Sequence, residues 1–169
     1  MKPTTRRSFL QTTGAVAAFP FVGKVLGANE KLNIGVVGVA GRGGGNMRDV
    51  AAVKESHIAA LCDVDQKNLT AAAKQFPDAQ RYRDFRKMLE QKDLDAVVCS
   101  TPDHTHAIVG VSALKSGRHL YCEKPLAHTV TEVRALTEAA AKHKRVTQMG
   151  NQIHSGSNYR RVVELVQGG

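Results

Sequence analysis

The sequence predicts an α/β protein in which parallel strands alternate with helices. Short apolar runs recur along the chain, and each is followed by a segment whose apolar residues have the spacing of one helix face. These runs are apolar on both faces, as strands of a buried parallel sheet are. The first run, residues 32–38, leads into a glycine-rich turn. Together these features predict a sheet that is covered by helices on both sides.

Strands and helices can be placed in order along the chain. Because parallel strands joined by helices cross over with one hand, short connections favour a doubly wound sheet. We therefore expect a Rossmann-type fold, with six strands in the order 3-2-1-4-5-6. The strands are expected at 32–38, 57–62, 80–82, 96–100, 119–122 and 146–149, and the helices at 43–54, 66–76, 84–91, 103–116, 129–140 and 158–166.

Capping residues support several of these helices. Asp65 stands directly before one predicted helix, where an aspartate can accept hydrogen bonds from free backbone amides. Thr129 and Glu132 have the spacing of a capping box. Gly117 follows the helix predicted at 103–116, and glycine is the usual residue just beyond a helix end.

The first 28 residues have the pattern of an export signal. Arg6 and Arg7 precede Ser8-Phe9-Leu10, and a weakly apolar run at 14–22 follows. The run is too short to form a stable membrane span, and small residues near 26–28 suit a cleavage site. We interpret residues 1–28 as a twin-arginine signal for a periplasmic or otherwise exported protein. The alternative is an uncleaved basic tail. Residues 29–169 can then bury one core and form one domain.

Charge does not indicate a nucleic-acid partner. The full chain has a formal net charge of +9, and residues 1–28 carry four of its basic residues and no acidic one. The remaining basic residues are scattered and are not interleaved with Tyr or Phe, whereas nucleic-acid surfaces combine basic patches with aromatic side chains. The one dense basic run, residues 142–145, is explained by the end of a helix.

Cysteine and histidine spacing does not indicate a metal site or a disulfide. Cys62, Cys99 and Cys122 each fall in a predicted strand and have no CxxC spacing, so buried free thiols are expected. His104 and His106 form a His-x-His pair that suits metals, but the sequence offers no matching ligand set.

The glycine-rich turn after the first strand predicts a bound dinucleotide. Such a turn needs glycines for a sharp turn, for close approach of the pyrophosphate, and for helix packing. Gly38, Ala40 and Gly43 occupy these places, so the second is alanine. Either Gly41 supplies the missing clearance or the methyl group is tolerated. Amides at the start of the helix would then hold the phosphate oxygens.

Asp63 is the expected acidic partner of this turn. It lies 20 residues beyond Gly43, at the end of the second strand. A carboxylate there accepts hydrogen bonds from the ribose hydroxyls and repels a 2′-phosphate, which favours NAD over NADP. Arg42 favours NADP instead, because its guanidinium can pair with the 2′-phosphate. The plain alternative for Asp63 is a capping or surface aspartate.

The loops at 101–106, 123–125 and 150–154 are expected to lie near the glycine turn, at the carboxyl ends of the strands. Ligands of open parallel sheets bind beyond these ends. We expect Asp103 to cap the following helix. Asn151 and His154 follow the sixth strand and are candidate substrate contacts, or else ordinary polar loop residues. The predicted coenzyme-binding residues are Gly38, Ala40, Gly41, Arg42, Gly43, Asp63, Thr101, Pro102, His106, Glu123 and Lys124.

Lys124 is the candidate catalytic residue. It follows the fifth strand in the sequence Glu123-Lys124-Pro125. Oxidation of an alcohol by hydride transfer requires removal of the hydroxyl proton, and a neutral amine can take it and return it in the reverse reaction. Partial burial and an oxidised nicotinamide would both lower the pKa of such a lysine. The alternative is an ordinary exposed lysine in a turn.

These motifs together resemble the glucose–fructose oxidoreductase, inositol dehydrogenase and rhizopine-catabolism (Gfo/Idh/MocA) family. The matching pieces cover nearly all of residues 31–167, and some members carry twin-arginine leaders. They are the turn at 38–43, Cys62-Asp63, residues 100–106, Glu123-Lys124-Pro125 and Gly150-Asn151-Gln152.

The resemblance implies NAD(P)-linked oxidation or reduction of a hydroxyl group on a sugar, cyclitol or related polyol. It implies that Lys124 is catalytic and that Glu123 lies on the coenzyme side. It also implies a second α/β domain that covers the nicotinamide, supplies much of the substrate site and often makes contacts in a homo-oligomer. No such domain follows Gly169, so we expect a fragment that is inactive alone.

Two other functions stay open. Some relatives of this fold cleave glycosides and use bound NAD for transient oxidation and reduction. A non-catalytic nucleotide-binding module is the third possibility, because the second domain is missing.

Overall fold

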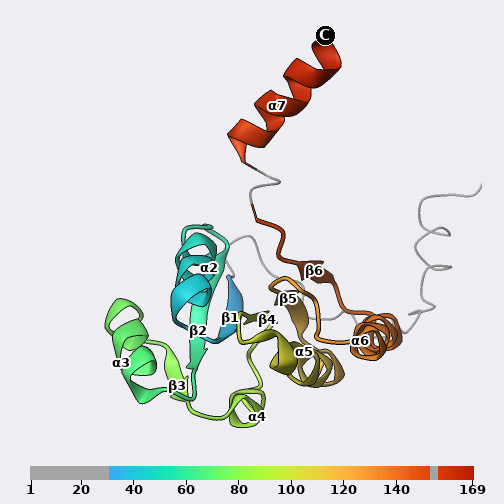
Figure 1. The fold of residues 1–169 in the computed structure, drawn as a ribbon. Helices are drawn as coiled ribbons and strands as arrows, with labels where there is room; N and C mark the ends of the chain where they lie inside the picture. The colour runs from blue at the N-terminus through green and yellow to red at the C-terminus, as the bar shows by residue number, and fades with distance from the viewer. Residues whose placement is uncertain (1–30, 153–155) are drawn as a thin grey trace, which may run out of the picture. The chain divides into compact units, whose positions relative to one another are not determined.

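The computed structural model describes residues 31–152 and 156–169. Its sheet has six parallel strands in the order β3-β2-β1-β4-β5-β6 (Figure 1). The predicted doubly wound fold and its strand order are therefore confirmed. The strands are β1 Leu32–Val37, β2 Ser56–Cys62, β3 Gln80–Tyr82, β4 Ala96–Cys99, β5 His119–Cys122 and β6 Thr147–Met149.

The helices follow the predicted order with ends that shift by up to three residues, and two of them also differ in form. The helix expected at 84–91 is only four residues long, because the amides of Glu90 and Gln91 bond three residues back and tighten the chain into a turn. The helix expected at 103–116 begins as one 3₁₀ turn after Pro102. The helices are α2 Gly41–Ala51, α3 Gln66–Gln75, α4 Phe85–Met88, η1 Asp103–Thr105, α5 His106–Lys115, α6 Val130–His143 and α7 Ser157–Gly168.

The predicted caps at three helix ends are confirmed. The Asp65 side chain accepts a hydrogen bond from the amide of Lys67 at 2.7 Å. Thr129 and Glu132 bond each other's amides in a capping box at the start of α6. Gly117 ends α5 with a φ of 86°, in the left-handed region that favours glycine. These caps fix where the loops of the rim begin and end.

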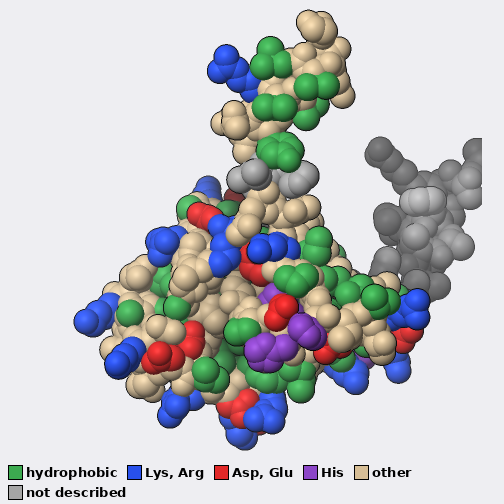
Figure 2. All heavy atoms as spheres, viewed as in Figure 1, with side chains coloured by type: hydrophobic (Ala, Val, Ile, Leu, Met, Phe, Trp, Pro, Cys, Tyr) green, Lys and Arg blue, Asp and Glu red, His purple; other side chains and the backbone are tan. Residues whose placement is uncertain are grey.

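Asp103 does not cap α5 as expected. Its side chain accepts from the amide of His104 at 2.8 Å and from Nδ1 of His128 at 3.3 Å. The cap position of α5 is instead Thr105, which makes no capping bond with its side chain. Asp103 Oδ1 also lies 3.8 Å from Nδ1 of His104. Figure 2 shows histidine side chains beside acidic ones on one face of the molecule.

Two apolar layers hold the sheet. One contains residues of α2 and α3 with inward side chains of β1 and β2, among them Met47, Leu61 and Leu69. The other contains residues of α4, α5 and α6, with Met88 and Leu114 completely buried. Both faces of the sheet are thus covered, as the apolar strands require. The cysteines Cys62, Cys99 and Cys122 are buried and free, which confirms the sequence-based expectation.

The export signal predicted at residues 1–28 lies outside the described residues. Within the described residues, no helix has the length and apolar character needed to cross a membrane.

Leu114 offers a direct test of the second apolar layer. Its side chain is 0% exposed, so Leu114→Ala removes buried methyl groups and leaves a cavity. We expect the free energy of unfolding to fall by about 2–5 kcal/mol in urea titrations of the full chain. Val130→Ala is the matched control, because Val130 is 69% exposed, and it should change stability by less than about 0.5 kcal/mol. Equal effects from the two variants would contradict this packing.

Candidate functional site

A cavity of about 660 Å³ opens at the carboxyl ends of β1, β2 and β4. It lies where loops from distant parts of the sequence converge, as expected for the ligand site of a doubly wound sheet. Its volume is in the range of small-molecule pockets. It is lined by Val37, Gly38, Ala40, Cys62, Asp63, Val64, Asp65, Asn68, Arg83, Asp84, Phe85, Arg86, Ser100, Thr101, Pro102, His104, Thr105, Ile108 and Val109.

The glycine turn forms one wall of this cavity, and two of its glycines are sterically required. Gly38 has a φ of 82°, and a Cβ there would lie 2.7 Å from the carbonyl oxygen of Ser100. A Cβ on Gly43 would overlap the carbonyl oxygen of Gly38. The start of α2 is therefore pressed against the end of β1, and this close approach needs the two missing side chains.

Ala40 fits this turn because of its backbone conformation. It is the N-cap of α2, with φ −104° and ψ 171°, which an alanine adopts without strain. The next residue, Gly41, takes the left-handed φ of 53°. In the described chain no side chain caps α2 and its first turn has no acidic residue. The free amides and the positive end of the helix dipole thus suit the phosphates of a dinucleotide.

Asp63 joins the second strand to the glycine turn. Its Oδ2 accepts from the amide of Val39 at 3.0 Å, and its Oδ1 accepts from the amide of Asp65 at 2.9 Å. Each carboxylate oxygen has a second lone pair, and the half-buried side chain lines the cavity. The carboxylate is therefore placed to accept hydrogen bonds from a ribose.

Arg42 and Glu123 form an ion pair across the rim. Arg42 Nε lies 3.0 Å from Glu123 Oε1, and the same oxygen accepts from Asn46 Nδ2 at 2.8 Å. Glu123 is only 5% exposed. Burial opposes its ionisation, but the hydrogen bonds from Asn46 and Arg42 outweigh it and lower the pKa of Glu123. The charge of Arg42 is thus already compensated, which weakens the interpretation of this residue as a 2′-phosphate ligand.

Lys124 stands at the same rim, outside the 660 Å³ cavity. Its side chain is exposed, its amide donates to Glu123 Oε2 at 3.3 Å, and its peptide bond to Pro125 is cis. Glu123 in turn contacts Arg42 of the glycine turn. The structure thereby places the predicted catalytic lysine next to the turn, with its amine free to meet a ligand that reaches past the cavity.

The other predicted residues are divided between the surface and the interior. Thr101 and Pro102 line the cavity, as expected of coenzyme contacts. His106 is only 1% exposed, and its two ring nitrogens lie at hydrogen-bond distance from Pro125 O and Thr101 O. Its ring lies beneath the rim and has no nitrogen left for a coenzyme, so the geometry differs from the direct contact that we expected.

The loop after β6 is described only in part. Asn151 is exposed just beyond β6, and His154 lies outside the described residues. Gly150 before them is buried, and its amide donates to Cys122 O at 2.7 Å. A Cβ at Gly150 would lie 2.6 Å from the hydroxyl of Tyr121 and 2.9 Å from Oε1 of Glu123. The loop after β6 therefore starts in close contact with the Glu123 side chain.

Several residues of the site were not predicted from the sequence. Asn46, which is 4% exposed and holds Glu123, lies on the inward face of α2 beside Met47. A polar residue on the apolar side of a predicted helix was the available signal. Val64 and Ile108 are exposed by 77% and 59% at the cavity. They offer apolar surface to the adenine base of a dinucleotide, but neither residue belongs to a recognisable sequence motif.

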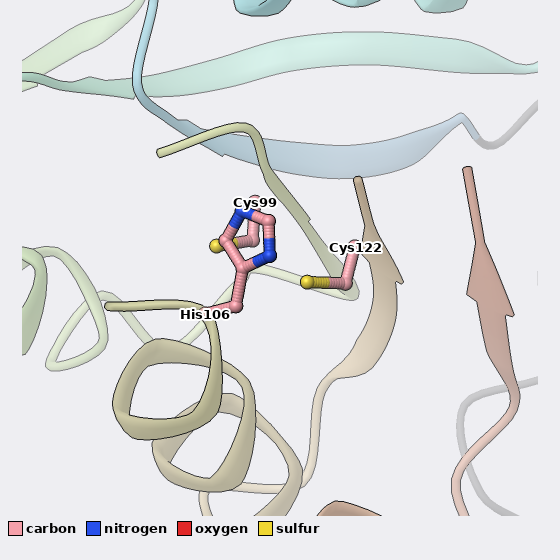
Figure 3. A group of neighbouring side chains, drawn as sticks. All are labelled: Cys99, His106 and Cys122. Carbon is pink, nitrogen blue, oxygen red and sulfur yellow. The ribbon is translucent and has the colours of Figure 1, made fainter. Parts of the chain in front are cut away.

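Cys99, His106 and Cys122 form a buried group in which the two sulfurs and one ring nitrogen all lie within 4.8 Å of one another (Figure 3). It is the only metal-ligand-like group found among the described residues. A metal would need a ring nitrogen of His106 with a free lone pair. Both nitrogens already face carbonyl oxygens at 2.7 and 2.8 Å, so the group does not suit a metal ion in this arrangement.

Comparison with known proteins gives this geometry a context. The Gfo/Idh/MocA family model, described as an oxidoreductase family with an NAD-binding Rossmann fold, matches residues 32–151. An inositol 2-dehydrogenase of Salmonella typhimurium is 29% identical over 141 residues, which cover 82% of this chain and 42% of that protein. A glycosyl hydrolase family 109 protein of Shewanella pealeana is 28% identical over 163 residues, which cover 90% and 36%.

A solved structure is similar over the same region. It is scyllo-inositol dehydrogenase from Lactobacillus casei with bound NAD(H) and scyllo-inositol, with a TM-score of 0.75 and 26% identity. The alignment covers 83% of this chain and 42% of that one. The chain thus spans less than half the length of the relatives that it matches.

The lowered pKa of Glu123 predicts a pH-dependent contribution to stability. The ionised carboxylate stabilises the fold above the ordinary glutamate value of 4.5, and this contribution is lost as the pH falls through the lower value of the folded state. We expect Glu123→Gln to reduce the free energy of unfolding by about 1–3 kcal/mol at pH 7 and by less at pH 3.5.

Urea titrations at the two pH values measure this difference. Glu138→Gln, on the exposed side of α6, is the control and should behave like the unaltered chain at both. A Glu123→Gln deficit that is the same at pH 7 and pH 3.5 would contradict an ionised buried carboxylate.

Proposed function

The chain belongs to the Gfo/Idh/MocA family of oxidoreductases with an NAD-binding Rossmann fold, and on this basis we propose that the whole protein transfers hydride between NAD and a hydroxyl-bearing carbon. The substrate class is a sugar, a cyclitol or a related polyol. The inositol dehydrogenase names of two relatives support this class. The observation that carries the proposal is the position of Lys124 beside the glycine turn, joined to it through Glu123 and Arg42.

The residues of the cavity suit the adenosine and phosphate parts of NAD. The space left by Gly38 and Gly43, the free amides of α2 and the carboxylate of Asp63 each match one part of the dinucleotide. When bound, the nicotinamide supplies the hydride acceptor or donor. Because Arg42 is paired with Glu123 and Asp63 is negative, NAD is the proposed coenzyme and NADP the alternative.

Lys124 performs the proton transfer in this proposal. As a neutral amine it removes the proton of the substrate hydroxyl while hydride leaves the same carbon, and as an ammonium it returns the proton in reduction. Glu123, which accepts from the amide of Lys124, holds the backbone from which the amine extends. Asn151 and His154 are proposed substrate contacts from the next loop of the rim.

Other parts of the whole protein are proposed from its relatives. Since this chain covers about 42% of the Salmonella dehydrogenase, the remaining length of a full protein would supply the second α/β domain and the outer wall of the substrate site. We propose a homo-oligomer for that protein. Residues 1–28 support export by the twin-arginine route.

A second candidate function is an NAD-dependent glycoside hydrolase. The Shewanella relative at 28% identity favours it. A hydrolase would release a sugar with no net NADH and would keep its coenzyme through turnover, whereas a dehydrogenase accumulates NADH. A non-catalytic nucleotide-binding module would bind NAD and do neither.

Lys124→Ala tests the proposed catalytic role. In the full-length protein with a panel of cyclitols and sugars, we expect NADH formation to fall by about 10²–10⁴-fold, because proton removal by a positioned base is lost. NAD affinity should change little. Lys115→Ala is the matched control, since Lys115 is exposed at the far end of α5. Turnover that survives in Lys124→Ala removes the mechanism, and glycoside cleavage without NADH selects the hydrolase.

Asp63→Ser tests the proposed coenzyme preference. It removes a charged acceptor for the ribose hydroxyls, so we expect NAD to bind about 10–100-fold more weakly and the preference for NAD over NADP to shrink. Dissociation constants from fluorescence titration measure both effects. Asp78→Asn, an exposed control after α3, should leave them unchanged. An unaltered ratio of the two affinities in Asp63→Ser would count against the assignment.

A further inference from the structure

A buried cluster beneath the coenzyme rim has no role in the function proposed above. Cys99 ends β4, His106 begins α5 and Cys122 ends β5. The two cysteines lie opposite each other on the neighbouring parallel strands β4 and β5, and both are free thiols. Figure 3 shows the imidazole and the two thiols pointing into the same space between the sheet and α5. The three side chains therefore act on one another and on nearby backbone, and not on solvent.

The ring of His106 lies between two hydrogen-bond acceptors. Nδ1 is 2.7 Å from the carbonyl oxygen of Pro125, and Nε2 is 2.8 Å from that of Thr101. A carbonyl oxygen can only accept, and a neutral imidazole has one N–H. In the neutral ring, one of these contacts would press two lone pairs together. Two donated hydrogen bonds require a proton on each nitrogen, which makes the ring an imidazolium.

A buried imidazolium needs a negative partner, and Cys99 can provide it. The neighbouring Cys122 side chain, with weaker contributions from Thr101 and His106, outweighs burial and lowers the pKa of Cys99 to about 6. The nearby Cys99 side chain, together with burial, raises the pKa of Cys122. Cys122 therefore keeps its proton, and its sulfur donates to Leu126 O at 3.8 Å. One thiolate, one thiol and one imidazolium give the cluster no net charge.

Other charged groups around the cluster are already engaged. Glu123, next to Cys122, bonds Arg42 and Asn46. Asp103, three residues before His106, bonds His128 at the surface. The Oγ1 of Thr101 lies 3.4 Å from the sulfur of Cys99 and is a further hydrogen-bond partner for it. The thiolate of Cys99 thus remains as the counter-ion of the ring.

The two carbonyl groups belong to the two loops that the proposed reaction must hold in register. Thr101 lines the 660 Å³ cavity, and Pro125 directly follows Lys124 in the chain. His106 reaches both from below with short hydrogen bonds. The imidazolium N–H bonds are charge-assisted and stronger than neutral ones, so the ring fixes the distance between the coenzyme loop and the lysine loop.

We propose that His106 is a positioning residue, held as an imidazolium with the Cys99 thiolate as its counter-ion, which sets the position of Lys124 relative to the coenzyme cavity. The effect on turnover rests on the proposed function. The charge state of the ring does not rest on the proposed function, so the charge-state proposal and the proposed function can fail separately.

The ¹⁵N NMR spectrum of the histidine ring nitrogens in the full chain tests the charge state. We expect both nitrogens of His106 to keep imidazolium shifts from pH 7 to 8.5, with through-bond experiments on the unaltered protein assigning the signals. His106→Gln should remove them. His57→Gln, the control on the exposed start of β2, should remove a different set. A His106 ring with one unprotonated nitrogen would overturn the proposal.

Cys99→Ser tests the counter-ion by the same measurement. Serine keeps a small polar side chain but stays neutral at these pH values, so the ring should lose one proton and show one unprotonated nitrogen. An imidazolium that persists in Cys99→Ser overturns the thiolate assignment.

Turnover of the full-length protein tests the positioning role. A displacement of about 1 Å at a catalytic group can cost about 100-fold in rate. We therefore expect His106→Gln to lower kcat by about 10- to 100-fold and to change KM for the polyol by less than about threefold. Unchanged kcat overturns the positioning role. If the unaltered protein forms no NADH with any polyol, the proposed function fails, and the NMR spectrum still decides the charge state of His106.

Discussion

The carboxylate of Glu123 is the group on which the geometry of the site depends. It is nearly buried, and its Oε1 accepts hydrogen bonds from Arg42 and Asn46 of α2, residues far away in the sequence. A buried carboxylate that lost these donors would be costly. The end of β5 is therefore locked against the start of α2, and Lys124 follows the locked residue directly. Without this contact the glycine turn and the lysine would share a rim but have no fixed relation.

The sheet brings these parts together, and the close approach of β1 and α2 shapes the cavity. Gly38 and Gly43 let the start of the helix touch the end of the strand, and the uncapped amides at this helix start suit phosphate groups. Asp63 fixes the turn from the other side through the amide of Val39. The cavity is lined by Gly38 and Ala40 of this turn, and Lys124 is joined to the same turn through Glu123 and Arg42. In the proposed function an extended dinucleotide would reach from one to the other.

The fold could be predicted from sequence because its signals are local and periodic. Apolar runs, the cap at Asp65 and the capping box at Thr129 each depend on a few neighbouring residues. The contacts that complete the site are long-range and leave weaker signals. The bond between Asn46 and Glu123 joins residues 77 apart, and the burial of His106 depends on how α5 packs on β4 and β5. His106 was predicted at the rim because its loop lies there, but helix packing turned its ring beneath it.

In the proposed reaction the amine of Lys124 meets the substrate hydroxyl beside the nicotinamide. A crystal structure of the full-length protein with NAD and a bound polyol measures this directly. We predict that Nζ of Lys124 lies within about 2.6–3.2 Å of a hydroxyl oxygen, on a carbon that faces C4 of the nicotinamide, with Glu123 still bonded to Arg42. A nicotinamide on the far side of the turn, with Nζ directed into solvent, would contradict it.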